Sequence, residues 1–291
     1  MRPFLLLSAF ALLASPAWAD TRVDERHAIA PGGRIEISNI AGKVTVRGWD
    51  RRDVQLTGTL SDGLTLKPEK SASRVRWEVV YPRRSNSGGA TLEVFVPRGV
   101  ELQLETVSAD IDIAGIDVKR VQANTVSGDV RAAGRSAEGT LNSVSGDVDT
   151  ELQTTRMEAR TVSGSIRAGG GLSGEIGATT VSGQVGVEAG RTQRLVVETV
   201  SGRIDLSAAA LAPGGRISAQ SVSAPISLRV PATVSAQLSI DSFSGNIQSD
   251  AGNVERPRHG PGSTLDTRLG SGDGDISLQS HSGGVRVRLD R

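Results

Sequence analysis

Two residue types recur in this sequence at a spacing that could support chemistry. Asp110, Asp129 and Asp147 occupy one position of three successive copies of a short repeated phrase. A serine occupies another position in eight copies, at Ser108, Ser127, Ser145, Ser163, Ser182, Ser201, Ser223 and Ser244. Serine can act as a nucleophile, and paired carboxylates hydrolyse glycosidic bonds. A nucleophile is a single residue beside a base, so eight equivalent serines indicate a structural role.

The aspartates leave two interpretations open. If the copies stack in register, the carboxylates lie about 5 Å apart and repel one another. Such an acidic column (Asp110, Asp129 and Asp147) could bind a cation or form an acid pair. Alternatively, the carboxylates splay into water and pair with nearby arginines. The second interpretation is favoured, because a neighbouring position alternates in sign along the chain, through Asp112, Arg131, Asp149 and Arg167.

The phrase is Thr/Ser-Val-Ser-Gly, and its valine defines position 0. Copies follow every 18 to 22 residues, at Val107, Val126, Val144, Val162, Val181, Val200 and Val222, with Phe243 in the same slot later. Apolar residues alternate with polar ones before the phrase, at positions −5 and −3, and after it, at +4 and +6. This period of two predicts two short half-buried strands with a bend between them. The sequence therefore predicts an all-β fold, a single-stranded β-solenoid (β-helix) whose 18–22-residue coils stack.

The phrase itself suggests how the bend is made. Glycine at +2 is expected to relieve a positive φ, although Ala109 and Ala224 replace it in two coils. The hydroxyls at −1 and +1 are expected to form ladders that bond the backbone or each other. Phe243, the one aromatic residue beyond residue 100, is expected to point inward.

The chain divides into five segments. Residues 1–19 have a basic start, an apolar run and an Ala-Trp-Ala cleavage pattern, which predicts a secretory signal peptide. Residues 20–100 are predicted to form an irregular N-terminal β cap, residues 101–248 the regular coils, and residues 249–264 a flexible polar loop. Residues 265–291 resume the alternation and are predicted to supply C-terminal coils and a cap.

Composition limits the possible partners and cofactors. The formal net charge is +1, which gives no reason to expect a nucleic-acid partner. There is no cysteine, so disulfides, thiolate metal sites and a lipid-modified cysteine are excluded. No second apolar run reaches spanning length, so we expect an exported chain that does not span a membrane. The periplasm is the favoured compartment, with secretion or the cell surface as alternatives.

Other candidate ligands are weak. His27, His259 and His281 are isolated in sequence, and no zinc motif surrounds them. The stretch SGDGD at 271–275 lacks most ligands of a calcium loop, so a solvated turn is expected. We therefore predict no metal site and no cofactor.

Three stretches carry a family resemblance: GGRIEISNIAGKVTVRGWDRRDVQLTG, VPRGVELQLETVSADIDI and the serial TVSGDV units. They resemble the bacterial DUF4097 family, whose members are often labelled adhesins. The resemblance covers roughly residues 30–290. It implies an exported β-solenoid and carries over no catalytic or ligand-binding residue.

The function favoured by the sequence is a non-enzymatic, adhesin-like scaffold or binding surface in the bacterial cell envelope. Its repeated polar faces suit a glycan, peptidoglycan or protein partner, and capped ends suit a monomer. The alternatives are a carbohydrate-active enzyme, a polysaccharide lyase or hydrolase that uses the acidic column, and an accessory protein of envelope-stress signalling.

Overall fold

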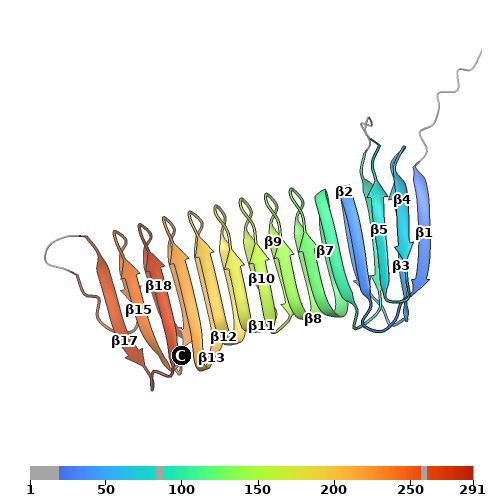
Figure 1. The fold of residues 1–291 in the computed structure, drawn as a ribbon. Coiled ribbons are helices and arrows are strands. Elements are labelled where there is room, and N and C mark those ends of the chain that lie inside the picture. The colour runs from blue at the N-terminus through green and yellow to red at the C-terminus, as the bar shows by residue number, and fades with distance from the viewer. Residues whose placement is uncertain (1–19, 83–87, 257–260, 291) are drawn as a thin grey trace, which may run out of the picture.

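The chain folds into a rod of stacked β-coils. The computed structural model describes residues 20–82, 88–256 and 261–290, and within these ranges it contains strands and no helix. Figure 1 shows the strands lying side by side along the whole rod, with a row of short bends along its upper edge. The predicted all-β solenoid is confirmed. The predicted signal peptide lies outside the described residues.

The strands fall into three groups along the chain. The first group is β1 (Thr21–Ala28), β2 (Arg34–Gly48), β3 (Asp53–Leu60), β4 (Thr65–Lys70), β5 (Arg74–Val80) and β6 (Ala90–Val96). The second group is β7 (Glu101–Asn124), β8 (Val130–Asn142), β9 (Val148–Gln153), β10 (Arg156–Arg160), β11 (Ile166–Thr179), β12 (Val185–Thr199) and β13 (Ile204–Ser221). The third group is β14 (Ile226–Pro231), β15 (Ala236–Ser242), β16 (Ile247–Ser249), β17 (Ser263–Leu269), β18 (Gly274–Ser280) and β19 (Val285–Asp290).

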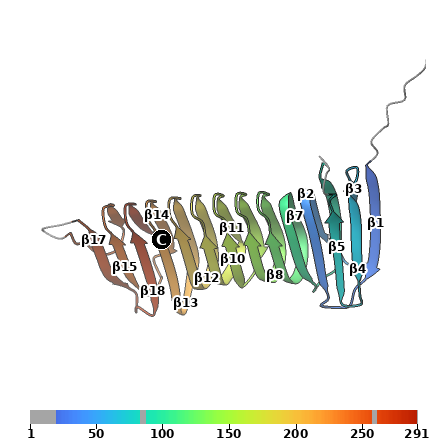
Figure 2. The ribbon, with the colours of Figure 1, turned by 45° about the horizontal axis from the view of Figure 1, so that its top comes forward.

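Each regular coil consists of one ascending and one descending strand, with the repeated phrase at the bend between them (Figure 2). Neighbouring coils pair in parallel and in register, for example Val130 opposite Val148 and Val121 opposite Gly139. Equivalent residues therefore lie above one another at about 4.8 Å. Any residue type that recurs in the repeat becomes a column along the rod.

The core is made of such columns. Residues at −5, −3, +4 and +6 point between the two strands and are almost fully buried, as Val121, Ala123, Val130 and Ala132 show in one coil. The alternation of the sequence predicts these positions correctly. Because the inward residues of every coil contact those of the next, the interior is one continuous hydrophobic core.

The glycine at +2 is required for a different reason from the one predicted. None of the glycines in the repeated phrases, from Gly128 to Gly245, has a positive φ, whereas Gly42, two residues after Ile40, has a φ of 111°. Instead, each glycine of the phrases lies against the carbonyl of the equivalent residue in a neighbouring coil. A Cβ on Gly164 would lie 2.0 Å from the carbonyl oxygen of Gly146, and one on Gly202 would lie 1.5 Å from that of Gly183. Close stacking of the bends, rather than backbone strain, selects glycine.

The N-terminal end of the rod is closed by antiparallel strands. β2 pairs with β7 on one side and with β5 and β6 on the other. β3 pairs antiparallel with β6 and with β1, and β4 pairs antiparallel with β5. The outermost strands carry Arg22, Asp24 and Glu25 in β1 and Pro68 in β4. Charges and proline on outer strands oppose edge-to-edge association.

At the C-terminal end the coils do not stack in chain order. β18 pairs with β13 on one side and with β15 on the other, and β19 pairs with both β14 and β16. The last coil of the chain, formed by β18 and β19, therefore lies between the coil of β13 and β14 and the coil of β15 and β16. β17 lies antiparallel on the outer side of β15, and it falls mostly within the segment 265–291 that was predicted to supply the C-terminal coils and cap.

The predicted loop 249–264 includes residues 257–260, which lie outside the described ranges; beside them Glu255 bridges to Thr264, the second residue of β17. Across the described ranges, no helix is long and apolar enough to span a bilayer.

Candidate functional site: the columns of the rod surface

The hydroxyl column at position −1 fastens one bend to the next. The Gly146 N–H donates to Ser143 Oγ at 2.9 Å, and that hydroxyl donates to the Gly128 carbonyl one coil earlier at 3.1 Å. Thr161 repeats both bonds, at 3.1 and 3.0 Å. These side chains are buried, so the bonds satisfy polar groups that water cannot reach. The −1 hydroxyl is therefore a structural device that bonds the backbone. The ladder expected at +1 is not found among the described residues: these serines are exposed, and only Ser201 and Ser244 donate to a carbonyl, at 3.4 and 3.2 Å.

The acidic column has a comparable role. The N–H of Asp129 donates to Oδ1 of Asp110, and the N–H of Asp147 donates to Oδ1 of Asp129, both at 3.0 Å. Ser165 continues the series, with its N–H 2.8 Å from Oδ1 of Asp147. Each carboxylate thus accepts the N–H of the same position in the next coil. These bonds account for three stacked carboxylates without a metal or an acid pair.

The alternating +5 position forms the ladder that its signs predict. Asp112 lies opposite Arg131, Arg131 opposite Asp149, and Asp149 opposite Arg167. Arg167 contacts Asp149 at 3.0 Å, and this carboxylate raises the pKa of the guanidinium. At the other end, the hydrogen bond from Arg47 lowers the pKa of Asp112. The ladder stabilises the stack by about 0.2–1 kcal/mol for each opposed pair.

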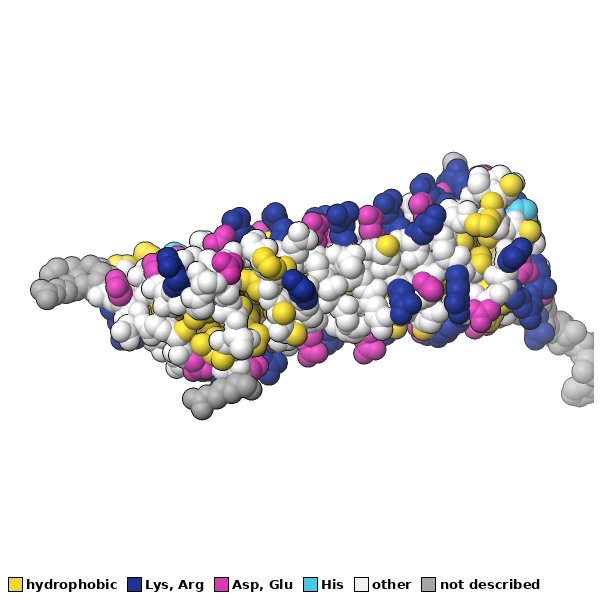
Figure 3. All heavy atoms as spheres, turned by 90° about the horizontal axis from the view of Figure 1, so that it is seen from below, with side chains coloured by type: hydrophobic (Ala, Val, Ile, Leu, Met, Phe, Trp, Pro, Cys, Tyr) yellow, Lys and Arg dark blue, Asp and Glu magenta, His cyan; other side chains and the backbone are white. Residues whose placement is uncertain are grey.

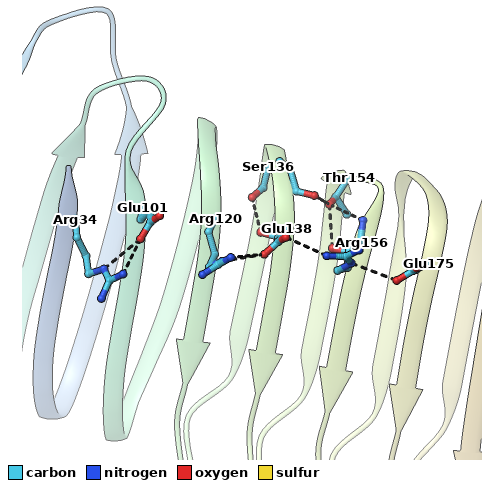
Figure 4. Close-up of polar contacts among 9 residues, drawn as sticks. Arg34, Glu101, Arg120, Ser136, Glu138, Thr154, Arg156 and Glu175 are labelled. Atoms are coloured by element: carbon cyan, nitrogen blue, oxygen red, sulfur yellow. Dashed lines mark hydrogen bonds and ion pairs between the residues drawn. The ribbon is translucent and has the colours of Figure 1, made fainter. Parts of the chain in front are cut away.

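A second charge column, at position −6, is not among the sequence-based predictions. Figure 4 shows its members side by side on neighbouring strands: Arg34, Glu101, Arg120, Glu138, Arg156 and Glu175. Arg120 contacts Glu138 at 2.7 Å, and Arg156 contacts Glu138 at 3.1 Å and Glu175 at 3.2 Å. The hydrogen bond from Arg120 lowers the pKa of Glu138. The signal was present in the sequence, since these residues alternate in sign at one repeat position.

Position 0 forms an exposed apolar column, which we name the valine ridge. Its large side chains are each 43–51% exposed: Ile40, Val107, Val126, Val144, Val162, Val181, Val200, Val222 and Phe243. Among the described residues, Val80 is the only other large hydrophobic side chain that is exposed. The inward orientation expected for Phe243 is therefore wrong. Phe243 lies outside and stacks on His281, with ring centroids 4.7 Å apart and planes at 6°.

A groove of about 810 Å³ runs beside the C-terminal half of this ridge. Val181, Val200, Val222 and Phe243 form one wall, and the −1 hydroxyls form the floor. The opposite wall consists of the polar side chains of position −2, namely Thr179, Glu198, Gln220, Asp241 and Gln279. The groove crosses five coils, so its shape suits an elongated partner lying parallel to the rod.

The remaining candidate ligands from the sequence, the histidines and the SGDGD stretch, contact nearby groups of the chain by hydrogen bonds or stacking where the structure describes them. His27 Nε2 lies 3.1 Å from the Ser71 carbonyl oxygen. In the SGDGD stretch, Asp273 accepts hydrogen bonds from the hydroxyls of Ser271 and Ser235 and so orders a turn. His259 lies outside the described residues. Within the described part of the chain, no three acidic, histidine or cysteine side chains converge as a metal site.

The comparison with protein families gives one match. The family model described as Toastrack DUF4097 matches residues 34–288. This confirms the resemblance noted from the repeated phrases. No curated protein matches the chain.

The chain is also similar to several solved structures, at low sequence identity. A "putative lipid binding protein" from Parabacteroides distasonis is 13% identical, with a TM-score of 0.48, over 92% of this chain and 96% of that one. A "putative adhesin" from Bacteroides fragilis is 8% identical, with a TM-score of 0.41, over 93% of this chain and 99% of that one. A "putative adhesin" from Parabacteroides merdae is 10% identical, with a TM-score of 0.39, over 72% of this chain and 92% of that one.

Proposed function

The chain belongs to the Toastrack DUF4097 family, and we propose that it is exported to the bacterial cell envelope, where it serves as a non-enzymatic, adhesin-like binding scaffold. Its favoured compartment is the periplasm. The observation that carries the proposal is the valine ridge, an apolar stripe that runs from Ile40 to Phe243. Contiguous exposed apolar patches on soluble proteins mark interaction sites.

On the valine ridge, the binding free energy would be spread over many small contacts, one at each coil. Burying the exposed part of one ridge valine contributes on the order of 1 kcal/mol. The same small contact recurs at every coil, so affinity grows with the length of partner that lies along the rod. Valine offers no hydrogen bond to a sugar hydroxyl. Among glycan, peptidoglycan and protein partners, an elongated protein surface therefore fits the ridge best.

The acidic column does not favour the enzyme alternative. Each of its carboxylates accepts a backbone N–H from the following coil. The column lies on the flank of a rod whose neighbouring charges are paired. No specific contact favours the signalling alternative either.

The binding proposal is tested by affinity retention from envelope extract. The immobilised chain is compared with the double variant Val144→Lys/Val162→Lys and with the control Val196→Lys. Val196 is an outward-facing, half-buried valine on the flank of β12. We expect the native chain and the control to retain the same partner, and the ridge variant to retain at least about tenfold less, because two apolar contacts are replaced by charges. Equal retention of the partner by all three proteins would contradict the proposal that the valine ridge binds it.

Export is tested separately. Cell fractionation should recover the chain with a periplasmic marker, and its N-terminal sequence should begin at Asp20. A chain that retains Met1 and stays in the cytoplasmic fraction would contradict the envelope location.

A further inference from the structure

A hollow of about 680 Å³ lies at the N-terminal end of the rod, on the side away from the valine ridge. Three turns that are distant in sequence form it: residues 29–31, 49–52 and 97–100. Figure 3 views the rod from this side and shows hydrophobic side chains gathered at the N-terminal end with basic side chains around them. We name this hollow the Trp49 pocket.

Backbone contacts hold the three turns together. Gly32 has a φ of 77° and Gly99 a φ of 74°, a conformation that favours glycine at both turns. The Gly33 N–H donates to the Ala30 carbonyl at 2.9 Å and closes the first turn, and the Glu101 N–H donates to the Gly33 carbonyl at 2.9 Å and ties the third turn to the first. The Trp49 N–H donates to the Val96 carbonyl at 3.0 Å. The pocket is therefore formed by the fold before any ligand arrives.

The indole of Trp49 is fixed in orientation. Its Nε1–H donates to the Asp53 carbonyl at 2.8 Å, and its ring stacks on Phe95 with centroids 5.2 Å apart. The guanidinium of Arg51 lies 5.0 Å from the ring centroid and that of Arg26 lies 5.6 Å from it. Such contacts attract a cation to the ring and hold it in place. Arg51 is thus positioned at the mouth of the pocket.

The rim of the pocket carries an excess of positive charge. Arg51, Arg52 and Arg98 line it together with a single acid, Asp50. Asp50 contacts Arg98 at 2.8 Å, but both side chains are mostly exposed, so this pair is weak and can exchange partners. The +5 column from Asp112 to Arg167 sets opposite charges against each other, whereas the rim holds three arginines and one acid. Clustered arginines present several donors in a geometry that matches a carboxylate.

The floor of the pocket is apolar. Ile29, Pro97 and Val100, which are buried, line it together with Trp49. An apolar floor with a few polar groups at the rim, enclosing a volume between about 300 and 1,000 Å³, is typical of a small-molecule site. A simple inorganic anion would leave that floor unused. The best-matched ligand therefore carries both a carboxylate and an apolar face.

We propose that the Trp49 pocket binds a carboxylated sugar unit, with the C–H face of the pyranose ring against the apolar floor, and its carboxylate held by Arg52 and by Arg51, which the indole of Trp49 positions. This site is separate from the valine ridge and does not depend on the function proposed for it. The two surfaces lie on opposite edges of the rod. A chain with both could join an acidic glycan to a protein.

The test is isothermal titration of the purified full-length chain at low salt with four probes. These are the trisaccharide of galacturonic acid, the neutral trisaccharide of galactose, inorganic phosphate, and vesicles that contain phosphatidylglycerol. The variants are Arg51→Gln/Arg52→Gln and Trp49→Leu, and the control is Arg203→Gln, an exposed arginine of the regular coils. Circular dichroism melts establish that each variant is folded.

We expect the acidic trisaccharide to bind with saturation and the other three probes to bind at least about tenfold more weakly. Only the acidic trisaccharide has both a carboxylate and an apolar sugar face. The double arginine variant and Trp49→Leu should each lose about tenfold or more in affinity, while Arg203→Gln binds as the native chain does. Four results would overturn the proposal: no binding of the acidic trisaccharide, equal binding of the neutral one, equal binding of phosphate or vesicles, or full affinity in the double arginine variant. None of these results affects retention on the ridge, so the two proposals fail separately.

Discussion

The backbone N–H of Asp147 donates to Oδ1 of Asp129, the residue that holds the same position one coil earlier, at 3.0 Å. This bond turns a possible catalytic carboxylate into part of the stack. A carboxamide has an oxygen in the same place, so Asp129→Asn should keep the bond and change the free energy of unfolding little. Asp129→Ala leaves the N–H without its acceptor and should cost about 1 kcal/mol. Urea denaturation of the two variants measures the difference. An equal loss in both would mean that the negative charge, and not the acceptor, is what the position requires.

Glycine at +2 provides a steric test of the stacking. Gly164→Ala places a Cβ 2.0 Å from the Gly146 carbonyl oxygen, so the two coils must separate. We expect destabilisation of about 1–3 kcal/mol or more. Gly186→Ala is the matched control, because its nearest neighbour, the Ile166 carbonyl oxygen, would be 4.0 Å from the new Cβ. Thermal melts compare the two, and similar melting temperatures would contradict the tight contact between bends.

The hydroxyl column makes a prediction about one buried atom. Thr161→Val removes an acceptor for Gly164 N–H and a donor to Gly146 O, while the shape of the side chain is kept. Both groups are then buried without a partner, which should cost about 1–3 kcal/mol. Thr161→Ser should retain most of the stability. Ser163→Ala, at the exposed +1 position, should be neutral, and a loss there as large as in Thr161→Val would show that the two serine/threonine columns are not distinct.

The Arg47–Asp112 pair links stability to pH. Its hydrogen bond lowers the pKa of Asp112 in the folded protein below the ordinary 3.8. A lowered pKa means that the ionised carboxylate stabilises the fold above its ordinary pKa, and that this contribution is lost as the pH falls through the lowered value. Asp112→Asn should therefore be less stable than the native chain at neutral pH, and the difference should shrink as the pH falls below about 4. A difference that stays constant from pH 7 to pH 2.5 would contradict this role.

Arg229 and Arg288 depart from the alternation of charge, as Arg194 and Arg216 do at position −6. Arg229 lies directly opposite Arg288 on the neighbouring strand, and its other neighbour is Ser207. Like charges in this arrangement are destabilising, so Arg229→Glu should raise stability by about 0.2–1 kcal/mol. Arg229→Gln removes the repulsion without adding an attraction, so its stability should lie between those of the native chain and Arg229→Glu. Melting temperatures at low salt would contradict the ladder argument if the glutamate variant were the least stable of the three.

The repeat made much of the fold predictable. Alternation identifies the inward residues, such as Val121 and Val130, because a strand has a period of two and each coil repeats the last. Position 0 is ambiguous, because counting forward from −5 and −3 places it outside, whereas counting back from +4 and +6 places it inside. The bend changes the parity, so alternation alone did not reveal that Phe243 is exposed. The insertion of β18 between β13 and β15 could not be predicted in this way. Every coil presents the same inward pattern to both neighbours, so periodicity does not specify their order.

The surface was predictable only where it follows the repeat. The +5 column follows from the signs of Asp112 and Arg131, and the −6 column would have followed from the same comparison. The Trp49 pocket has no such signal, since its walls come from turns on three separate segments outside the regular repeat. Only the antiparallel closure of the N-terminal end brings these turns together.

The most direct test of the binding-scaffold account is site-specific photo-crosslinking in living cells. A photoreactive amino acid replaces Val162 on the ridge in one strain and Val196 on the flank in another, with expression and stability matched. The account predicts a discrete crosslinked partner from position 162 and none from position 196. Absence of any adduct from Val162, or the same adducts from both positions, would contradict the conclusion that the valine ridge is the binding surface.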